Sequence, residues 1–280
     1  MPQLGRVRAL LKQSTPAPVW SRASGFYWWW YNRGQHRLAA SLSPRWRRSL
    51  RDLRGFANSH LGQRCFIIGN GPSLRQTDLT RLQGEVTFGL NRIYLLFDEL
   101  GFATTYYVAV NTLVIEQCAE EIRRLTMPKF LTWRSRNWTA EDPKVVFLDA
   151  DYTGEETFTK DLTDRVFEGG TVTYVALQLA YYMGFAEAIL VGVDHRYVTT
   201  GPANLTVESQ AADPNHFHPD YFGKGFRWQL PDLPASERAF RLARQTFEED
   251  GRRVLDATIG GMLTVFPKVA YTDLFRRPGY

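Results

Sequence analysis

From residue 64 onward, the 280-residue chain alternates between short apolar runs and stretches with helical spacing. A short apolar run fits a strand that is buried on both faces, and apolar residues repeating every three or four positions fit a helix. Strands are expected at 65–69, 86–90, 105–110, 129–133, 145–150, 188–193 and 252–258, and helices at 77–82, 112–125, 171–185 and 236–251. A further apolar stretch occupies 93–100. This alternation predicts an α/β fold, with a Rossmann-like, mainly parallel sheet and helices on both faces.

We place the α/β domain at residues 64–280 and treat residues 1–63 as an N-terminal extension. The first 64 residues carry twelve Lys or Arg side chains and one acidic side chain, whereas the remainder holds more acidic than basic residues. Six consecutive aromatic residues occupy 26–31, and a short helix is expected near 43–56. The basic and aromatic character of the chain is therefore concentrated ahead of the predicted domain.

The sequence leaves two interpretations of this extension open. Trp and Tyr favour the membrane–water interface and Arg is attracted to anionic headgroups, so one expectation is contact with a membrane surface. The other is packing on the body or on a second subunit of a homo-oligomer. Nucleic acid is not an expected partner, because no binding motif accompanies the charge. No 18 consecutive residues are apolar, and two cysteines are too few for a disulfide framework, which indicates a cytoplasmic or peripheral membrane protein without a transmembrane helix.

Residues 194–234 connect a fully apolar run to the last predicted helix and show neither helical nor strand periodicity. The segment is polar and contains Pro, Gly and aromatic residues. Connections of this length are uncommon in compact domains and are usually functional. We therefore expect a lid over the site.

Polar residues follow three successive predicted strands. The first run, CFIIG, leads into Asn70-Gly71-Pro72-Ser73, Asn91 follows the second run, and Asn111 follows the third. The carboxyl ends of parallel strands form the ligand-binding edge of such a sheet. Because an amide side chain offers both a donor and an acceptor, three Asn side chains at this edge predict a site for the ribose, base or phosphate of a nucleotide. A single Asn is also a common turn residue.

The loop after the first strand differs from the standard phosphate-binding loops. It lacks the Lys-Ser/Thr pair of a P-loop, and Leu74 stands where GxGxxG has its third glycine. Gly69 and Gly71 still allow the backbone to approach a ligand closely. A second candidate for phosphate is Gly170-Thr171, because a helix is expected to begin there. Close packing is the alternative explanation of those glycines.

Two histidines, His216 and His218, lie inside the predicted lid. Imidazole titrates near neutral pH and is suited to general-base catalysis. Asp194 and His195 add further ligand-type side chains, but the spacing of the set matches no known metal site. We therefore expect a base in the lid and no metal.

Five segments occur in a characteristic order: GNGPSL after an apolar strand, FGLNRIYL, VAVNTLVIEQ, a Thr-rich start to a buried helix that ends in MGF, and ILVGVDHRY. This order resembles the bacterial family-42 sialyltransferases and the broader MptE-like domain family, over about residues 64–275. The broader family includes the motility-accessory-factor glycosyltransferases and archaeal 6-hydroxymethylpterin pyrophosphokinases. The resemblance implies a Rossmann-like domain with a lid.

The resemblance also implies roles for individual residues. In the sialyltransferases the donor is CMP-activated sialic acid, the strand-end asparagines contact the nucleotide, a lid histidine is the general base, and no metal is required. The base here would be His216, with His218 in reserve. The expected donor-binding residues are Asn70, Gly71, Pro72, Ser73, Asn91, Asn111, Gly170, Thr171, Thr173, Asp194, Tyr197 and Tyr221.

The chain departs from the sialyltransferases at two positions. Glu168-Gly169-Gly170 stands where they have an Arg before the Ser/Thr, and Arg196 stands where a tyrosine assists the departing phosphate. Tyr197, Tyr221 or the charge of Arg196 is the expected replacement for that tyrosine.

These features predict a metal-independent inverting glycosyltransferase. Its donor would be a nucleotide-activated sugar, in the first place CMP-sialic acid or a related nonulosonate, and its acceptor a glycan or glycolipid. The alternative is an MptE-like pyrophosphokinase that transfers diphosphate from ATP to a pterin-type alcohol, with Mg²⁺ held by Asp149, Asp151 and Asp194. A binding protein without catalytic activity on the same fold is the third hypothesis.

Overall fold

The computed structural model describes residues 42–139, 141–152 and 155–276. The chain divides into two compact units, 1–48 and 49–280, and all strands of the described part lie in the second. The aromatic run at 26–31 and most of the predicted extension lie outside the described residues, so the expectations for them stay predictions.

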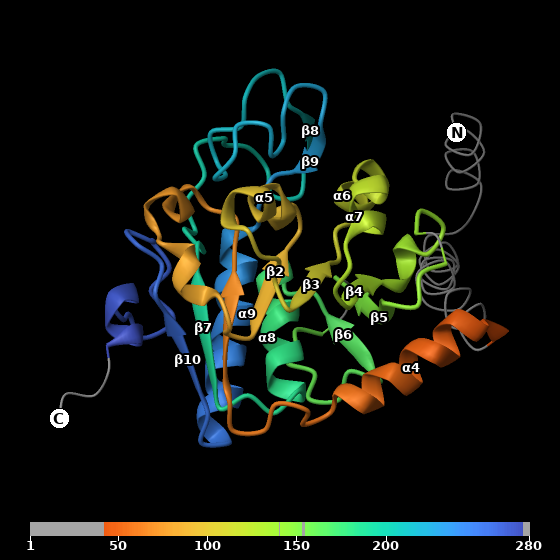
Figure 1. Ribbon diagram of the computed structural model, residues 1–280. Coiled ribbons are helices and arrows are strands. Elements are labelled where there is room, and N and C mark those ends of the chain that lie inside the picture. Colours follow the sequence, from red (N-terminus) through yellow and green to blue (C-terminus); the bar gives the residue numbers. More distant parts are fainter. Residues whose placement is uncertain (1–41, 140, 153–154, 277–280) are drawn as a thin grey trace, which may run out of the picture. The chain divides into compact units, whose positions relative to one another are not determined.

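Eight parallel strands form the main sheet of the described chain, in the order β10-β7-β1-β2-β3-β4-β5-β6 (Figure 1). Their bounds are β1 Arg64–Ile68, β2 Thr87–Leu90, β3 Tyr106–Ala109, β4 Lys129–Thr132, β5 Val145–Asp151, β6 Arg165–Phe167, β7 Glu187–Val191 and β10 Arg253–Asp256. The predicted α/β fold is confirmed. A separate antiparallel hairpin consists of β8 Thr206–Glu208 and β9 Arg227–Gln229.

The helices connect these strands. The α-helices are α4 Pro44–Phe56, α5 Phe97–Leu100, α6 Thr112–Gln117, α7 Ala119–Arg124, α8 Val172–Tyr182 and α9 Leu233–Glu249. Short 3₁₀ helices are η2 Pro72–Gln76, η3 Leu79–Leu82, η4 Ile93–Leu96, η5 Trp133–Ser135 and η6 Tyr271–Phe275.

Alternate side chains of the strands pack on the two faces of the sheet. On one face, Cys65 and Ile67 of β1 join a core with α8 and α9. Residues 173–181 of α8 are all buried, because this helix is apolar on nearly every side. On the other face Phe66 stacks on Phe275 of η6, with ring centroids 5.9 Å apart. Helices therefore cover both faces, as expected.

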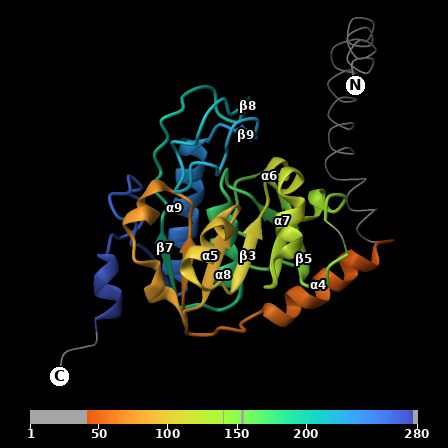
Figure 2. The ribbon, with the colours of Figure 1, turned by 45° about the horizontal axis from the view of Figure 1, so that its top comes forward.

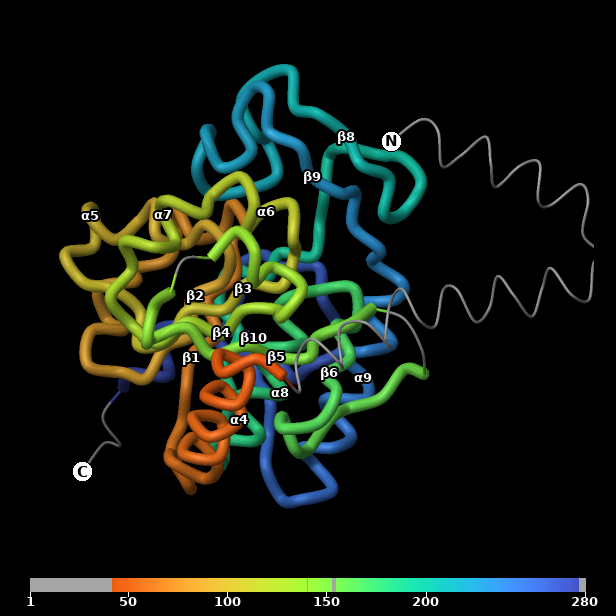
Figure 3. The backbone as a smooth tube through the Cα atoms, turned by 90° about the vertical axis from the view of Figure 1, so that its right-hand side faces the viewer, coloured from red at the N-terminus to blue at the C-terminus, as the bar shows by residue number. Residues whose placement is uncertain are grey.

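The direction in which strands are added reverses beside β1. The chain proceeds from β1 through β2 to β6 on one side, and then returns to place β7 on the other side of β1. The chain leaves β1 toward β2 and leaves β7 toward β10, so the topological switch point, where α/β sheets bind ligands, lies at the carboxyl ends of β1 and β7. The segment that carries β8 and β9 stands at this same edge in all three views (Figure 1, Figure 2 and Figure 3).

Several boundaries differ from the sequence predictions. The helix expected at 112–125 is interrupted at Cys118, and β6 was not predicted because its three residues give no periodic signal. The last helix begins at Leu233, three residues before the predicted start at Ser236. Asp232 caps this helix, and Pro is favoured in a first helical turn. Leu53 of α4 has no exposed surface and joins the sheet's core, so the core includes a residue that precedes position 64.

Within the described residues, no helix combines the length and apolar character needed to cross a bilayer.

Candidate functional site

The GNGPSL loop lies tightly against the loop that follows β7. The amide of Gly69 donates to Val191 O and that of Gly71 to Gly192 O, both at 2.8 Å. A Cβ on Gly71 would overlap the carboxylate of Asp194, and one on Gly69 would overlap the backbone of Gly192. Glycine is required at both positions because the two loops approach so closely.

Asp194 holds this loop in place. Its Oδ2 accepts from the Ser73 hydroxyl at 2.6 Å, and its Oδ1 accepts from the Ser73 amide at 3.1 Å. Both side chains are buried. The carboxylate therefore fixes the GNGPSL loop by accepting both hydrogen bonds from Ser73.

Asn70 and Asn91 end the adjacent strands β1 and β2. The amide nitrogen of Asn70 donates to Leu90 O at 3.1 Å, which fixes the side chain with Oδ1 as its second polar atom. Oδ1 of Asn70 and Oδ1 of Asn91 are both buried and have no hydrogen-bond partner among the residues that the structure describes. Asn91 adopts a left-handed backbone with φ of 47°, which Asn tolerates better than most residues. Two unpartnered acceptors at one sheet edge are suited to a ligand's hydroxyl or amino groups.

Asn111 follows β3, but both ends of its side chain are bonded. Its Oδ1 accepts from Leu113 N at 2.9 Å, which caps α6, and its Nδ2 donates to Gln229 Oε1 of β9 at 3.3 Å. It shares the carboxyl edge with the other two asparagines and contacts the lid.

The lid is docked directly on the strand-end loops. Phe217 donates its amide to Asn70 O at 3.0 Å, and its carbonyl accepts from Arg75. Arg92, the residue after Asn91, donates to Asp220 O at 2.7 Å and to Tyr221 O. The segment 217–221 is therefore fixed to the loops after β1 and β2.

A second set of bonds fixes the hairpin end of the lid. The side chain of Gln117 in α6 donates to Arg227 O at 2.8 Å and accepts from Arg227 N at 2.9 Å. The predicted lid at 194–234 is therefore a docked cap with its own hairpin, rather than a structureless connection.

His216 forms a buried pair with Asp213 inside the lid. Its Nδ1 lies 2.7 Å from Asp213 Oδ2, and its side chain is 10% exposed. The neighbouring residue, Phe217, is the one that bonds to Asn70 O. The predicted general base is thus placed beside the GNGPSL loop and carries a carboxylate partner.

Aromatic rings hold the imidazole of His216. The ring of Tyr221 stacks on it at 4.0 Å between centroids, and the rings of Phe222 and Tyr197 meet it edge-on. Burial raises the pKa of Tyr197 to about 12, with Asp213 and Asp194 adding to the rise, and burial raises the pKa of Tyr221 well above its usual value. Both phenols are therefore protonated at neutral pH.

The remaining predicted residues lie around this centre or outside it. His218 bonds to Asp220 N within its own turn. Thr171 caps α8 through Thr173 N at 3.3 Å, and Gly170 has φ of 72°. Their roles toward a ligand stay predictions.

Glu168 precedes the glycine pair and forms an ion pair with Arg134. Burial raises the pKa of this carboxyl to about 7, with Arg134 opposing the rise and Asp151 adding to it. Arg134, which follows β4, therefore has an acidic partner already.

Comparison with known proteins defines the family. Residues 40–200, more than half of the chain, match the family described as 6-hydroxymethylpterin diphosphokinase MptE-like. The chain belongs to the MptE-like family. No curated protein matches this MptE-like chain.

Among solved structures, the MptE-like chain is similar in fold to the MAf glycosyltransferase from Magnetospirillum magneticum AMB-1. The identity is 14% and the TM-score 0.49, and the match covers 82% of this chain and 39% of the other. The chain thus spans well under half of that protein's length.

The carboxylates proposed to hold Mg²⁺ do not come together in this MptE-like chain. Asp149 and Asp151 lie on β5 and Asp194 follows β7, and four strands separate β5 from β7. At about 4.8 Å per strand spacing, the two ends are roughly 24 Å apart. One ion therefore cannot bind all three of these candidate ligands.

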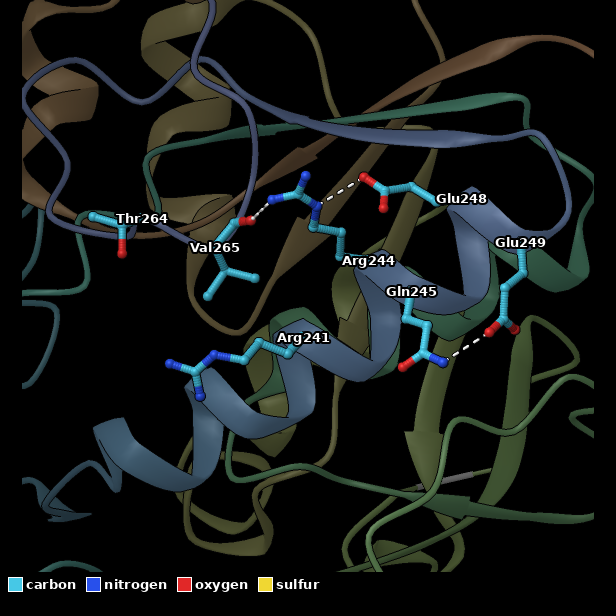
Figure 4. A pocket seen from close by; sticks show the side chains of 7 residues that line it. All are labelled: Arg241, Arg244, Gln245, Glu248, Glu249, Thr264 and Val265. Atoms are coloured by element: carbon cyan, nitrogen blue, oxygen red, sulfur yellow. Dashed lines mark hydrogen bonds and ion pairs between the residues drawn. The ribbon is translucent and has the colours of Figure 1, made fainter.

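A groove of about 440 Å³ lies along the C-terminal half of α9 (Figure 4). Its lining residues are Arg241, Arg244, Gln245, Glu248, Glu249, Thr264 and Val265. Arg244 bonds to Glu248 at 2.7 Å, and Gln245 to Glu249 at 2.7 Å. None of the strand-end asparagines or lid histidines lines the groove, so we place the candidate site at the carboxyl edge.

Sequence reasoning missed two residues of this MptE-like site. Asp213 stands three residues before His216 in the same loop, and this short spacing could have suggested that the carboxylate contacts the imidazole. Arg92 directly follows Asn91, and its position after a strand end could have singled it out.

Proposed function

We propose that this MptE-like chain transfers an activated group from a nucleotide to an acceptor hydroxyl, with His216 as the general base. One observation carries the proposal. The His216–Asp213 pair lies on a lid segment that bonds directly to Asn70, beside the buried acceptors of Asn70 and Asn91. Elements far apart in the sequence thereby bring the proposed base close to the proposed ligand-binding edge.

In the proposed reaction, the acceptor hydroxyl attacks the anomeric carbon of a nucleotide-activated sugar. Its proton passes to Nε2 of His216, which has no hydrogen-bond partner among the described residues. The bond between the anomeric carbon and the phosphate oxygen breaks, and its electron pair leaves with the nucleotide. Attack opposite the leaving group inverts the anomeric centre. Protonated Tyr197 and Tyr221 near this base are candidate donors to the leaving phosphate.

We take the donor to be a CMP-activated sialic acid or a related nonulosonate, and the acceptor to be a glycan or glycolipid. The order of the GNGPSL, Asn91, Asn111 and lid motifs supports this choice. Asn70 and Asn91, with their free acceptors, are the proposed contacts to the nucleoside's hydroxyl or amino groups.

The family description names a diphosphokinase, and diphosphate transfer to an alcohol also begins with a deprotonated hydroxyl. That reaction normally uses Mg²⁺ held by carboxylates. The ligand set suggested for it is split between distant strands, so we favour sugar transfer without a metal.

A thermal-shift screen of CMP, CDP, UDP, GDP and ATP, each with Mg²⁺ and with EDTA, tests the donor class. A ligand that binds only the folded protein raises its stability. We expect selective stabilisation by CMP or CDP in EDTA. Stabilisation by ATP that depends strictly on Mg²⁺ would instead establish the diphosphokinase alternative.

Replacing the base separates catalysis from binding. His216→Ala is expected to lower the transfer rate by roughly 10²- to 10⁴-fold, the usual contribution of general acid–base catalysis, while CMP still stabilises the protein. His218→Ala is the matched control in the same turn and should retain activity. A His216→Ala enzyme with near wild-type rate would show that the base is another residue.

Contact between residues 1–63 and a membrane surface, self-association and a cytoplasmic location stay proposals. Co-sedimentation with anionic vesicles, compared with vesicles of neutral lipid, tests the first of these.

A further inference from the structure

We propose that Asp213 is a positioning residue that sets the tautomer and orientation of His216. The inference rests on the proposed role of His216 as a base. It adds a second residue to the machinery, one that no sequence motif indicated.

The carboxylate of Asp213 is buried, with 3% of its side chain exposed. Its Oδ1 accepts from Asn215 N at 2.7 Å, and its Oδ2 accepts from Phe222 N at 3.1 Å as well as facing His216 Nδ1 at 2.7 Å. Two backbone amides therefore aim one oxygen at the imidazole. Within the described residues, the ion pairs formed by Asp213 involve His216 alone.

This arrangement decides which ring nitrogen carries the proton. Oδ2 can only accept, so Nδ1 must be protonated, and in neutral imidazole the lone pair then lies on Nε2. Stacking on Tyr221 fixes the plane of the ring at the same time. A carboxylate also stabilises the imidazolium that forms once the acceptor proton has been taken.

The other polar groups around the pair do not replace this function. Tyr197 and Tyr221 face the imidazole and are protonated at neutral pH, and Asp194 lies close enough to raise the pKa of Tyr197 but is bonded to Ser73. Asp213 is the group whose carboxylate lies within hydrogen-bond distance of Nδ1.

Asp213 also organises its own loop, so the experiment must separate positioning from folding. In Asp213→Asn, an amide oxygen in the place of Oδ1 still accepts from Asn215 N. An NH₂ group in the place of Oδ2 donates to Nδ1 and favours the opposite tautomer, at the cost of the bond from Phe222 N. The control is Asn215→Ala. Asn215 ties the same loop to Val198 N at 2.7 Å and to Thr199 Oγ1 at 3.0 Å without touching the imidazole.

Kinetics of the full-length variants give the first readout. We expect Asp213→Asn to lower kcat by at least tenfold, and by no more than the roughly 10²- to 10⁴-fold loss expected of His216→Ala. The double variant, which combines Asp213→Asn with His216→Ala, should be no slower than His216→Ala alone. Substitutions of residues that act as one unit do not have additive effects on the rate. Asn215→Ala should leave kcat close to the value of the wild type.

A double variant slower than His216→Ala by the full factor of Asp213→Asn would show that Asp213 acts on the fold alone. An Asp213→Asn enzyme with the kcat of the wild type would overturn the proposal as well.

The imidazole tautomer gives a readout that requires no activity. Long-range nitrogen–proton NMR correlations, assigned with His216→Ala, should show a proton on Nδ1 in the wild type and on Nε2 in Asp213→Asn. If both proteins show the Nε2–H form, Asp213 does not position the ring. If the tautomer changes as expected while no nucleotide donor supports transfer, the proposed function fails and the positioning of His216 stands.

Discussion

The pair formed by Asp194 and Ser73 leads to a quantitative prediction about the GNGPSL loop. Asp194→Ala removes the acceptor of the Ser73 hydroxyl and of the Ser73 amide, and both side chains are buried. Hydrogen bonds to a charged group contribute about 1.5–3 kcal/mol, and a buried donor left unpaired costs about 1–3 kcal/mol. We therefore expect the free energy of unfolding to fall by about 3 kcal/mol.

Ser73→Ala removes only the hydroxyl bond, so it should cost about 2 kcal/mol. The double variant leaves only the Ser73 amide unpaired, and it should be more stable than the sum of the single losses predicts. The coupling energy expected from this double-mutant cycle is about 1.5–3 kcal/mol.

Urea titrations at pH 7, followed by circular dichroism, measure these free energies. Asp78→Ala is the control, because Asp78 is an exposed carboxylate bonded to Thr80 and Arg81 outside the loop, and its midpoint should match the wild type. Losses that add within about 0.5 kcal/mol would refute the reasoning. Reduced CMP affinity in Asp194→Ala with unchanged stability would instead assign Asp194 to the ligand.

Two further predictions concern the edges of the site. Because burial raises the pKa of Glu168 to about 7 from an ordinary value near 4.3, the folded protein binds the proton more tightly, and stability should fall by up to about 3 kcal/mol as pH rises from 4.5 to 7. Glu168→Gln should reduce this dependence of the free energy of unfolding on pH, as measured by urea titrations between pH 4.5 and 7. An unchanged dependence would contradict the prediction. Arg92→Ala should release the carbonyls of Asp220 and Tyr221 and speed amide hydrogen exchange across 217–222 by roughly tenfold or more, since each bond to a charged donor contributes at least 1.5 kcal/mol. Arg81→Ala is the matched control, and equal exchange in the two variants would show that Arg92 does not hold the lid.

The sequence was sufficient for the sheet because each central strand is a continuous apolar run. Runs such as 65–69 and 188–193 cannot be exposed on either face, so parallel packing under helices was the consistent solution. The strand β6 and the hairpin of β8 and β9 were missed because three-residue strands are fixed by their neighbours rather than by their own pattern.

The site was predictable in part, for a related physical reason. Asn70, Asn91 and Asn111 follow strands, so their place at one edge is a consequence of topology. The bond from Phe217 to Asn70 O and the carboxylate of Asp213 on His216 depend on how a long loop folds back, which no local pattern specifies. The same holds for Asp194, where the sequence indicated a ligand contact and the structure shows a bond to Ser73.

The lid contributes no strand to the main sheet and has its own hairpin and its own hub at Asp213. It is attached to the carboxyl edge through several hydrogen bonds, which involve Asn70, Ser73, Arg75, Arg92, Asn111 and Gln117. Residues 198–212 of the lid include no buried side chain, so changes in this stretch do not require repacking of the core. In evolutionary terms, this exposed stretch can vary in sequence and length while Asp194, Asp213 and the sheet are inherited unchanged.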